Sequence, residues 1–300
     1  HTDAGLRTVF VQVPGDGDDE DALLEGLVRL APRAGPSTSI ALGSAEPFDA
    51  DRLARRWAVA RELGLRIHGH LASGSAAGTV ARLASRGLLG DDVTLVHCSG
   101  LDEKDLDAVA DSGASVSLSP SSDMAEGSGS PPIQQLIDHG IRPGLGVDHE
   151  RLAPGDAFAQ MRATISLQHA TVFDLKLAGK AGLPKLMSTR DVIRYATTEG
   201  ARVAGLSGVT GSIEPGKQAD IIVLRTDRPN IFPVNDPIGA VVWGMDTSNL
   251  DWVFVGGRVL MREGVLEADV ARARDLASRA RQRVAVASGP VPGGATGGEG

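Results

Sequence analysis

Cysteine is almost absent: Cys98 is the only one in 300 residues, so no intrachain disulfide can form. A basic surplus is also lacking, because 38 acidic residues against 30 Lys and Arg leave a net charge of -8. This balance argues against a general binder of nucleic acid or of anionic membranes. No run approaches the roughly 20 apolar residues of a membrane-spanning helix. We expect a cytoplasmic protein with no nucleic-acid and no membrane partner.

An initiator methionine is missing too, since the sequence opens at His1, and its first residues do not resemble a signal peptide. What is present is typical of a folded globular protein: 42% of the residues are hydrophobic and 23% are charged. The length suits one α/β barrel of about 250 residues with a short remainder.

Short apolar runs alternate with stretches of helical period through the first half of the chain. In residues 51–63, for example, Leu53, Trp57 and Ala60 fall on one helical face. Strands that alternate with helices predict parallel βαβ units, and six of them predict a wound sheet or most of a barrel. The expected strands are residues 8–13, 38–42, 66–71, 93–96, 114–118 and 143–147.

The second half reads differently. Residues 155–171 and 189–204 are expected to be helices, and short strands are expected at 211–224, 240–243, 251–255 and 258–261. Gly256-Gly257 is expected to close a hairpin. We divide the chain into a barrel at 1–206, a β-sandwich part at 207–266, a helix at 267–286 and a disordered tail at 287–300.

Three reactive side chains fall at the carboxyl ends of predicted strands: His70, His97 and Asp148. In α/β barrels that end of the strands is the active-site face. Imidazole nitrogens and a carboxylate suit a divalent ion such as Zn²⁺ or Fe²⁺, which would lower the pKa of a bound water. A single strand histidine is more often structural, but three coincident positions favour a site.

The remaining histidines have simpler interpretations. His68 lies deeper in the same strand as His70, so we favour a structural role for it. His139 at a helix end and His169 on a long helix are expected to be structural or surface residues. His149 and Glu150 follow Asp148 directly. The sequence allows two positions for them, one lining the pocket and one facing solvent.

Several segments together resemble the amidohydrolase superfamily, in its branch of triazine hydrolases, cytosine deaminases and S-adenosylhomocysteine deaminases. The His68-Gly69-His70 segment is similar to the fifth-strand metal-binding motif, and His97-Cys98 to the start of the sixth-strand motif. The other similar segments are residues 117–124, 140–148, 196–201 and 211–220.

The resemblance implies a TIM-type (β/α)₈ barrel with a small β-sandwich, and it implies roles for the site residues. His70 and Asp148 would be metal ligands, Asp148 would also take the proton of the attacking water, and His97 would polarise the scissile bond. Ser73, Asp123, His149 and Glu150 would contact substrate. No lysine precedes Lys104, so a carboxylated lysine on the fourth strand is missing. This favours one divalent ion, zinc first and iron or manganese as alternatives.

The sequence departs from the family pattern in two respects. Ser73 stands where the deaminases have a glutamate that protonates the ring, and Asp123 where relatives often have asparagine. A serine hydroxyl is no carboxylic acid at neutral pH. The family's first-strand H-x-H pair has no counterpart either, because residues 8–13 look like the third strand. We therefore expect two barrel strands to be missing and the printed chain to be incomplete.

The leading hypothesis is a metal-dependent hydrolase of non-peptide C–N bonds, acting on a small heterocyclic molecule. A homo-oligomer is a further expectation, since relatives commonly assemble. The alternative is a non-catalytic fragment or pseudoenzyme of the same fold that serves as a binding or assembly partner. A dinucleotide-binding protein is disfavoured, because Gly144-Leu145-Gly146 lacks the third glycine of that fingerprint.

Overall fold

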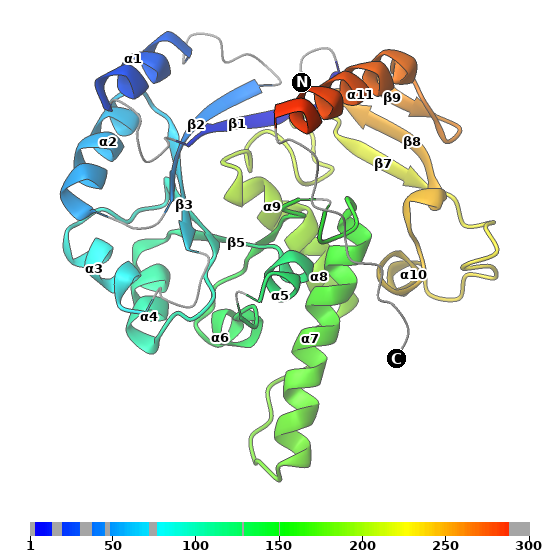
Figure 1. Ribbon diagram of the computed structural model, residues 1–300. Coiled ribbons are helices and arrows are strands. Elements are labelled where there is room, and N and C mark those ends of the chain that lie inside the picture. The colour runs from blue at the N-terminus through cyan, green and yellow to red at the C-terminus, as the bar shows by residue number, and fades with distance from the viewer. Residues whose placement is uncertain are drawn as a thin grey trace, which may run out of the picture.

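One curved sheet of six parallel strands forms the first half of the protein (Figure 1). The computed structural model describes residues 4–13, 20–30, 38–45, 49–71, 77–127, 129–149 and 151–287. The strands follow chain order across the sheet, as βαβ units require. They are β1 (Thr8–Gln12), β2 (Thr38–Ala45), β3 (Arg66–Leu71), β4 (Val93–His97), β5 (Ser115–Leu118) and β6 (Gly144–Leu145).

Helices connect these strands and follow the outer side of the curve (Figure 1). The predicted helical face is confirmed, since Leu53, Trp57 and Ala60 are all buried. The Trp57 indole Nε1 donates to Ser44 Oγ at 3.2 Å, which satisfies its one donor inside the core. The helices are α1 (Glu20–Leu30), α2 (Ala50–Glu62), α3 (Thr79–Ser85), α4 (Glu103–Ser112), α5 (Pro120–Ala125) and α6 (Ile133–Asp138).

A separate antiparallel sheet follows in the second half, with strand order β10-β9-β8-β7. The Gly-Gly hairpin is confirmed: Val255 pairs with Arg258, and Gly256 and Gly257 have φ of 57° and 80°. Positive φ at both turn positions is what a two-residue hairpin loop needs. The strands are β7 (Ile221–Leu224), β8 (Leu250–Val255), β9 (Arg258–Arg262) and β10 (Val265–Leu266).

The other elements of this half are helical. They are α7 (Ala157–Leu177), α8 (Thr189–Ala196), α9 (Thr198–Val203), α10 (Pro237–Trp243), a 3₁₀ turn η2 (Thr247–Asn249) and α11 (Val270–Ala287). Among the described residues, no helix is long and apolar enough to cross a membrane. Residues 288–300 of the expected tail lie outside the described residues.

Three expected elements differ from the structure. Only residues 221–224 of the strand expected at 211–224 form a strand, because Pro215 and Gly216 make a turn in the preceding segment. Residues 240–243 form the end of helix α10 and not a strand, because Asp236 accepts from Ile238 N at 3.1 Å and Pro237 occupies the first turn. The expected helix at 189–204 is two helices. It breaks at Thr197, whose φ and ψ of -126° and -86° are not helical and whose hydroxyl donates back to Ile193 O at 2.7 Å.

Candidate active site

The carboxyl ends of the central strands bring His70 and His97 together. Parallel pairing of β3 with β4 sets His70 opposite Val96 and Leu71 opposite His97. The two imidazole rings lie with their centroids 5.6 Å apart. On β3 the side chains alternate: Ile67, Gly69 and Leu71 are buried against the helices, while His68 and His70 share the opposite face.

Backbone strain marks the same strand ends. His97, Cys98 and Asp148 have φ of 68°, 64° and 68°, in the left-handed region that non-glycine residues rarely adopt. Such conformations cost about 1–3 kcal/mol each and persist where surrounding structure imposes them, often at active sites. Here Cys98 N is fixed by donating to Leu71 O at 3.0 Å. These left-handed backbone conformations therefore set the directions in which the His97 and Asp148 side chains project.

A buried carboxylate stands behind His97. Asp123, which is 2% exposed, lies with Oδ1 2.6 Å from His97 Nδ1. This hydrogen bond, together with the Asp123 charge, raises the pKa of His97 against the opposing effect of burial. The contact fixes the ring so that Nε2 is left free for other partners.

The neighbouring histidines are held neutral by their surroundings. Burial, with the charge of His97, lowers the pKa of His70, and Asp148 opposes the shift. Burial lowers the pKa of His68 to about 4, and the nearby Arg66 adds to the effect. A neutral imidazole keeps a lone pair for a metal or a proton. His68 lies one layer deeper than His70, in keeping with its expected structural role.

Asp148 also lies close to His149 and Glu126. His149 Nε2 lies 2.8 Å from Glu126 Oε1 and 4.0 Å from Asp148 Oδ2. Among the described residues, Glu126, Asp148 and His149 offer ligand atoms that all lie within 4.8 Å of one another. Sequence reasoning missed Glu126, which follows α5 on an exposed turn and carries no local motif. The structure places His149 in this cluster, while Ser73 and Glu150 lie outside the described residues.

Helix α5 explains the position of Asp123. Pro120 begins a helix whose fourth residue, Asp123, is turned inward and buried. Ser122 Oγ donates to Val147 O at 3.0 Å and so ties the helix to the segment that carries Asp148. Helix α5 thus holds both the partner of His97 and a support for Asp148.

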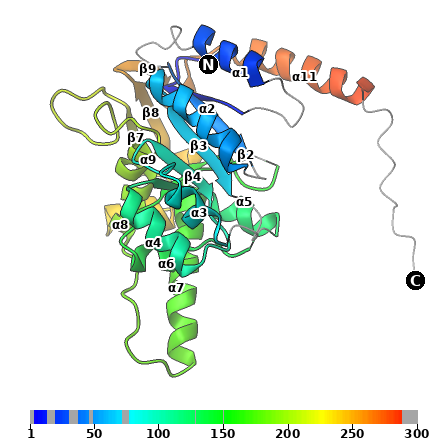
Figure 2. The same ribbon diagram turned by 90° about the vertical axis from the view of Figure 1, so that its left-hand side faces the viewer.

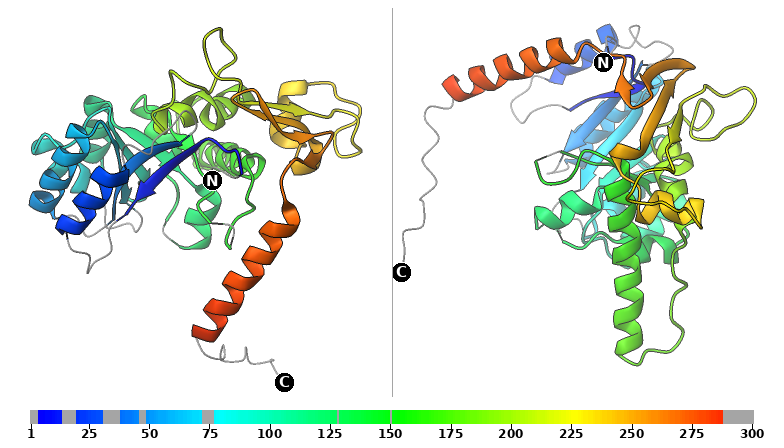
Figure 3. Two further views of the ribbon diagram at one scale, coloured as in Figure 1. Left: turned by 90° about the horizontal axis from the view of Figure 1, so that it is seen from above. Right: turned by 90° about the vertical axis from the view of Figure 1, so that its right-hand side faces the viewer.

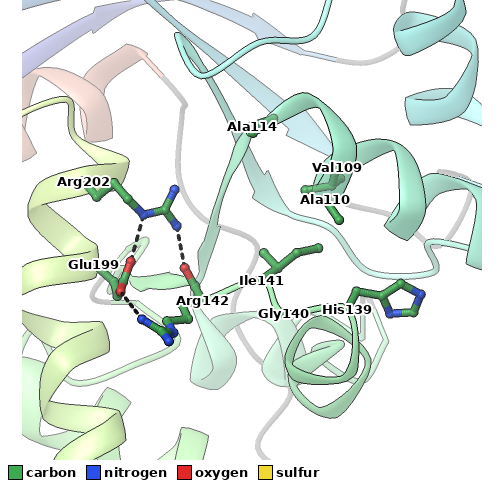
Figure 4. A pocket seen from close by; sticks show the side chains of 10 residues that line it. Val109, Ala110, Ala114, His139, Gly140, Ile141, Arg142, Glu199 and Arg202 are labelled. Atoms are coloured by element: carbon green, nitrogen blue, oxygen red, sulfur yellow. Dashed lines mark hydrogen bonds and ion pairs between the residues drawn. The ribbon is translucent and has the colours of Figure 1, made fainter.

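A pocket of about 320 Å³ lies at the other end of the strands (Figure 4). Its charged groups are engaged with one another: Arg202 Nε donates to Glu199 Oε2 at 2.8 Å, and an Arg202 terminal nitrogen donates to Arg142 O at 2.7 Å. Another Arg202 nitrogen donates to Ser115 Oγ at 2.9 Å. These contacts hold α9 against the starts of β5 and β6. The polar groups of this pocket therefore have a structural role.

Comparisons with known proteins agree on one family. A model of the amidohydrolase family matches residues 11–281. The 5-methylthioadenosine/S-adenosylhomocysteine deaminase 1 of Syntrophus aciditrophicus is 31% identical over 209 residues, 67% of this chain and 44% of that protein. The 5'-deoxyadenosine deaminase of Methanothermobacter thermautotrophicus is 34% identical over 182 residues, 60% of this chain and 40% of that protein. The chain thus spans less than half the length of these relatives.

Solved structures share the fold. A zinc-bound adenosine deaminase from Xanthomonas campestris has a TM-score of 0.82 at 23% identity, covering 94% of this chain and 67% of its own. A mutant atrazine chlorohydrolase from Arthrobacter aurescens, complexed with zinc and atraton, has a TM-score of 0.80 at 22% identity, covering 93% and 66%. The six parallel strands with their helices and the separate antiparallel sheet are therefore an architecture these proteins share.

Proposed function

Because the chain belongs to the amidohydrolase family, we propose that it is a metal-dependent hydrolase of non-peptide C–N bonds in a small heterocyclic molecule. The observation that carries this proposal is the convergence of His70, His97 and Asp148 at the carboxyl ends of β3, β4 and β6, with strained backbone at two of them. The similarity to deaminases of 5-methylthioadenosine, S-adenosylhomocysteine and 5'-deoxyadenosine supports the substrate class.

We propose one divalent ion at this site, because the donor types present suit it. His70 offers a neutral imidazole and Asp148 an exposed carboxylate, which suit Zn²⁺ first and Fe²⁺ or Mn²⁺ as alternatives. When bound, such an ion lowers the pKa of a coordinated water to about 7. Catalytic zinc usually has three protein ligands. Glu126 and His149 stand beside Asp148 as further donors.

The chain's own residues would divide the proton transfers. Asp148 would accept the proton of the attacking water, since its charge opposes the lowering of the His70 pKa and helps to raise that of His97, which places it near both rings. His97, held by Asp123, would present Nε2–H to the scissile bond or leaving group. Asp123 is buried, so its contribution to substrate binding would pass through His97. His149, with Ser73 and Glu150, remains a proposed substrate contact.

We also propose the architecture that these residues would complete. The six-stranded sheet would be part of a (β/α)₈ barrel within residues 1–206, and the antiparallel sheet would be part of a β-sandwich within 207–266, followed by a helix at 267–286. The shared fold of the solved relatives supports this division.

Metal content and ammonia release test the function together. The protein, purified with any residues that precede His1 in its natural chain, should contain about one equivalent of zinc, iron or manganese and should release ammonia from an adenosine-type substrate. Asp148→Asn should lower turnover by about 10²–10⁴-fold, the usual contribution of a general base. The matched control is Asp111→Asn on exposed α4, which should leave turnover unchanged. A folded protein without stoichiometric metal would instead support a non-catalytic role.

A further inference from the structure

Asp148 lies beyond the end of the strand that leads to it. Strand β6 comprises only Gly144 and Leu145. One further hydrogen bond follows, in which Gly146 N donates to Leu118 O of β5 at 2.7 Å. Among the described residues, the hydrogen bonds of the parallel sheet thus end before Asp148, whose φ of 68° is left-handed. Because such a conformation persists only where its surroundings impose it, contacts outside the sheet must hold this residue.

Helix α5 holds the residues on both sides of Asp148. Ser122 Oγ donates to Val147 O at 3.0 Å. On the other side, His149 Nε2 donates to Glu126 Oε1 at 2.8 Å, since a carboxylate only accepts. Ser122 and Glu126 are four residues apart and both have right-handed helical backbone, so they share one face of the helix. We name these two hydrogen bonds the α5 clamp.

The helix that carries the clamp is itself anchored. Ser121 N donates to Gln160 Oε1 at 3.3 Å, and Gln160 is 1% exposed in the first turn of α7. Asp123 of the same helix is held by His97. Figures 2 and 3 show α7 as the long helix whose far end stands clear of the other elements, whereas its first turn supports α5. The clamp therefore has a fixed base.

We propose that Glu126 is a positioning residue for Asp148 and acts through His149. This inference rests on the proposed function, in which Asp148 binds the metal and accepts a proton from water. His149 Nε2 lies 4.0 Å from Asp148 Oδ2, too far for a hydrogen bond, so the effect passes through the backbone. With Val147 and His149 both fixed, the planar peptide groups between them set the direction of the Asp148 side chain.

The clamp acts locally rather than on the stability of the whole protein. The side chains of His149 and Glu126 are 35% and 36% exposed, and an exposed pair adds little to the free energy of unfolding. The pair lies, however, beside a residue that the sheet does not hold. Losing it should therefore displace the Asp148 carboxylate without lowering the thermal unfolding midpoint. A merely structural contact would give the opposite pattern.

Zinc affinity and turnover in the full natural chain give the first test. Glu126→Ala should weaken zinc binding, measured by competition with a chelator, and should lower kcat, each by about tenfold, with KM within about twofold. The thermal unfolding midpoint should stay that of the wild type. A rise in KM alone would overturn the proposal, because Glu126 would then act on the substrate through His149 and not on Asp148.

The matched control is Glu103→Ala. Glu103 also lies beside a histidine near the surface, with Oε2 3.3 Å from His139 Nε2, but on the outer helix α4. Its removal should change neither the zinc affinity nor kcat. Equal losses in Glu103→Ala and Glu126→Ala would contradict a specific role for the clamp.

Glu126→Gln separates positioning from direct metal binding. Its amide oxygen can still accept from His149 Nε2–H, so zinc affinity and kcat should return to within about threefold of the wild type. An amide is not among the usual ligands of zinc, whereas a carboxylate is. If Glu126→Gln weakens zinc binding as much as Glu126→Ala does, Glu126 is itself a ligand and the proposal is wrong.

Hydrogen exchange tests the clamp without metal or substrate. In the metal-free protein, the peptide that carries residues 146–149 should exchange about twofold to fivefold faster in Glu126→Ala, because losing an exposed pair favours local opening by that factor. This difference in a wild type that binds no zinc would contradict the proposed function while supporting the clamp. Equal exchange in the two proteins would overturn the clamp, whatever metal the wild type binds.

Discussion

Arg7 and Asp220 join the two sheets of the molecule. The Arg7 guanidinium, just before β1, lies with Nε 2.5 Å and a terminal nitrogen 3.0 Å from the Asp220 carboxylate, just before β7. The same carboxylate accepts from Gly256 N at 2.7 Å in the Gly-Gly hairpin. One side chain thus fixes the start of the parallel sheet and the turn of the antiparallel sheet, although 213 residues separate it from Arg7 in sequence.

Removing this charge should destabilise the protein. Asp220→Asn keeps the shape but weakens three charge-assisted hydrogen bonds, so the free energy of unfolding should fall by about 2 kcal/mol. Urea unfolding followed by circular dichroism measures it. Asp227→Asn is the control, because Asp227 forms an ion pair with Arg225 on the surface. Equal effects of the two substitutions would contradict the role of Asp220.

Acid should act through the same residue. The hydrogen bond from Arg7 lowers the folded-state pKa of Asp220 below its usual value. A depressed folded pKa gives stability that is present above the unfolded pKa, about 4, and is lost as pH falls through the folded pKa. The wild-type unfolding midpoint should therefore drop more steeply below pH 4 than that of Asp220→Asn. If the unfolding midpoints of the wild type and of Asp220→Asn fall in parallel as the pH is lowered, other carboxylates control the loss of stability in acid.

Among the carboxylates on the outer helices, Asp105 should lower the free energy of unfolding most when it is removed. It is fully buried in α4 and accepts from Gly78 N at 2.7 Å and Ala81 N at 2.9 Å, which fixes the start of α3. Asp105→Ala leaves these donors unsatisfied and should lower stability by about 2–4 kcal/mol. Asp107, two residues along and exposed, provides the matched Asp107→Ala control.

Asp123 should control activity without contacting substrate. Asp123→Ala removes the partner of His97 Nδ1 and should lower kcat/KM by about 10–100-fold, as partners of site histidines usually do. Asp123→Asn can still hold the ring and should lose less. Metal content should be nearly unchanged in both. Wild-type turnover in Asp123→Ala would mean that packing alone orients His97.

The lone cysteine should report on unfolding. Burial raises the pKa of the Cys98 thiol above its ordinary value, and none of its surface is exposed. Because the thiolate is the reactive form, a thiol reagent at pH 8 should label the native protein slowly and the urea-unfolded protein at once. Prompt labelling without urea would show that the carboxyl end of β4 opens readily.

The sequence allowed the sheet to be predicted because its signals are local. The range of β3 was predicted correctly, since six alternating residues end at turn formers. Residues 240–243 misled because a short apolar run suits strand and helix alike. The cap at Asp236 and Pro237 was the deciding signal, four residues earlier.

The candidate site, too, could be predicted from the sequence only in part. His70, His97 and Asp148 could be proposed together because parallel strands end at one edge. The contact of Asp123 with His97 could not, since it depends on α5, a helix of only six residues that turns Asp123 inward. Glu126 reaches His149 across 23 positions of sequence, and no periodicity connects them.

The left-handed backbone at His97, Cys98 and Asp148 has a consequence for how this chain could change. Glycine would adopt these conformations without penalty, so Asp148→Gly should relieve part of the strain. A lineage released from its chemistry would have such a strain-relieving substitution within reach at Asp148. The chain printed here has none of the three glycines. At positions 97 and 148 the side chain that the proposed chemistry needs is one that the backbone conformation disfavours.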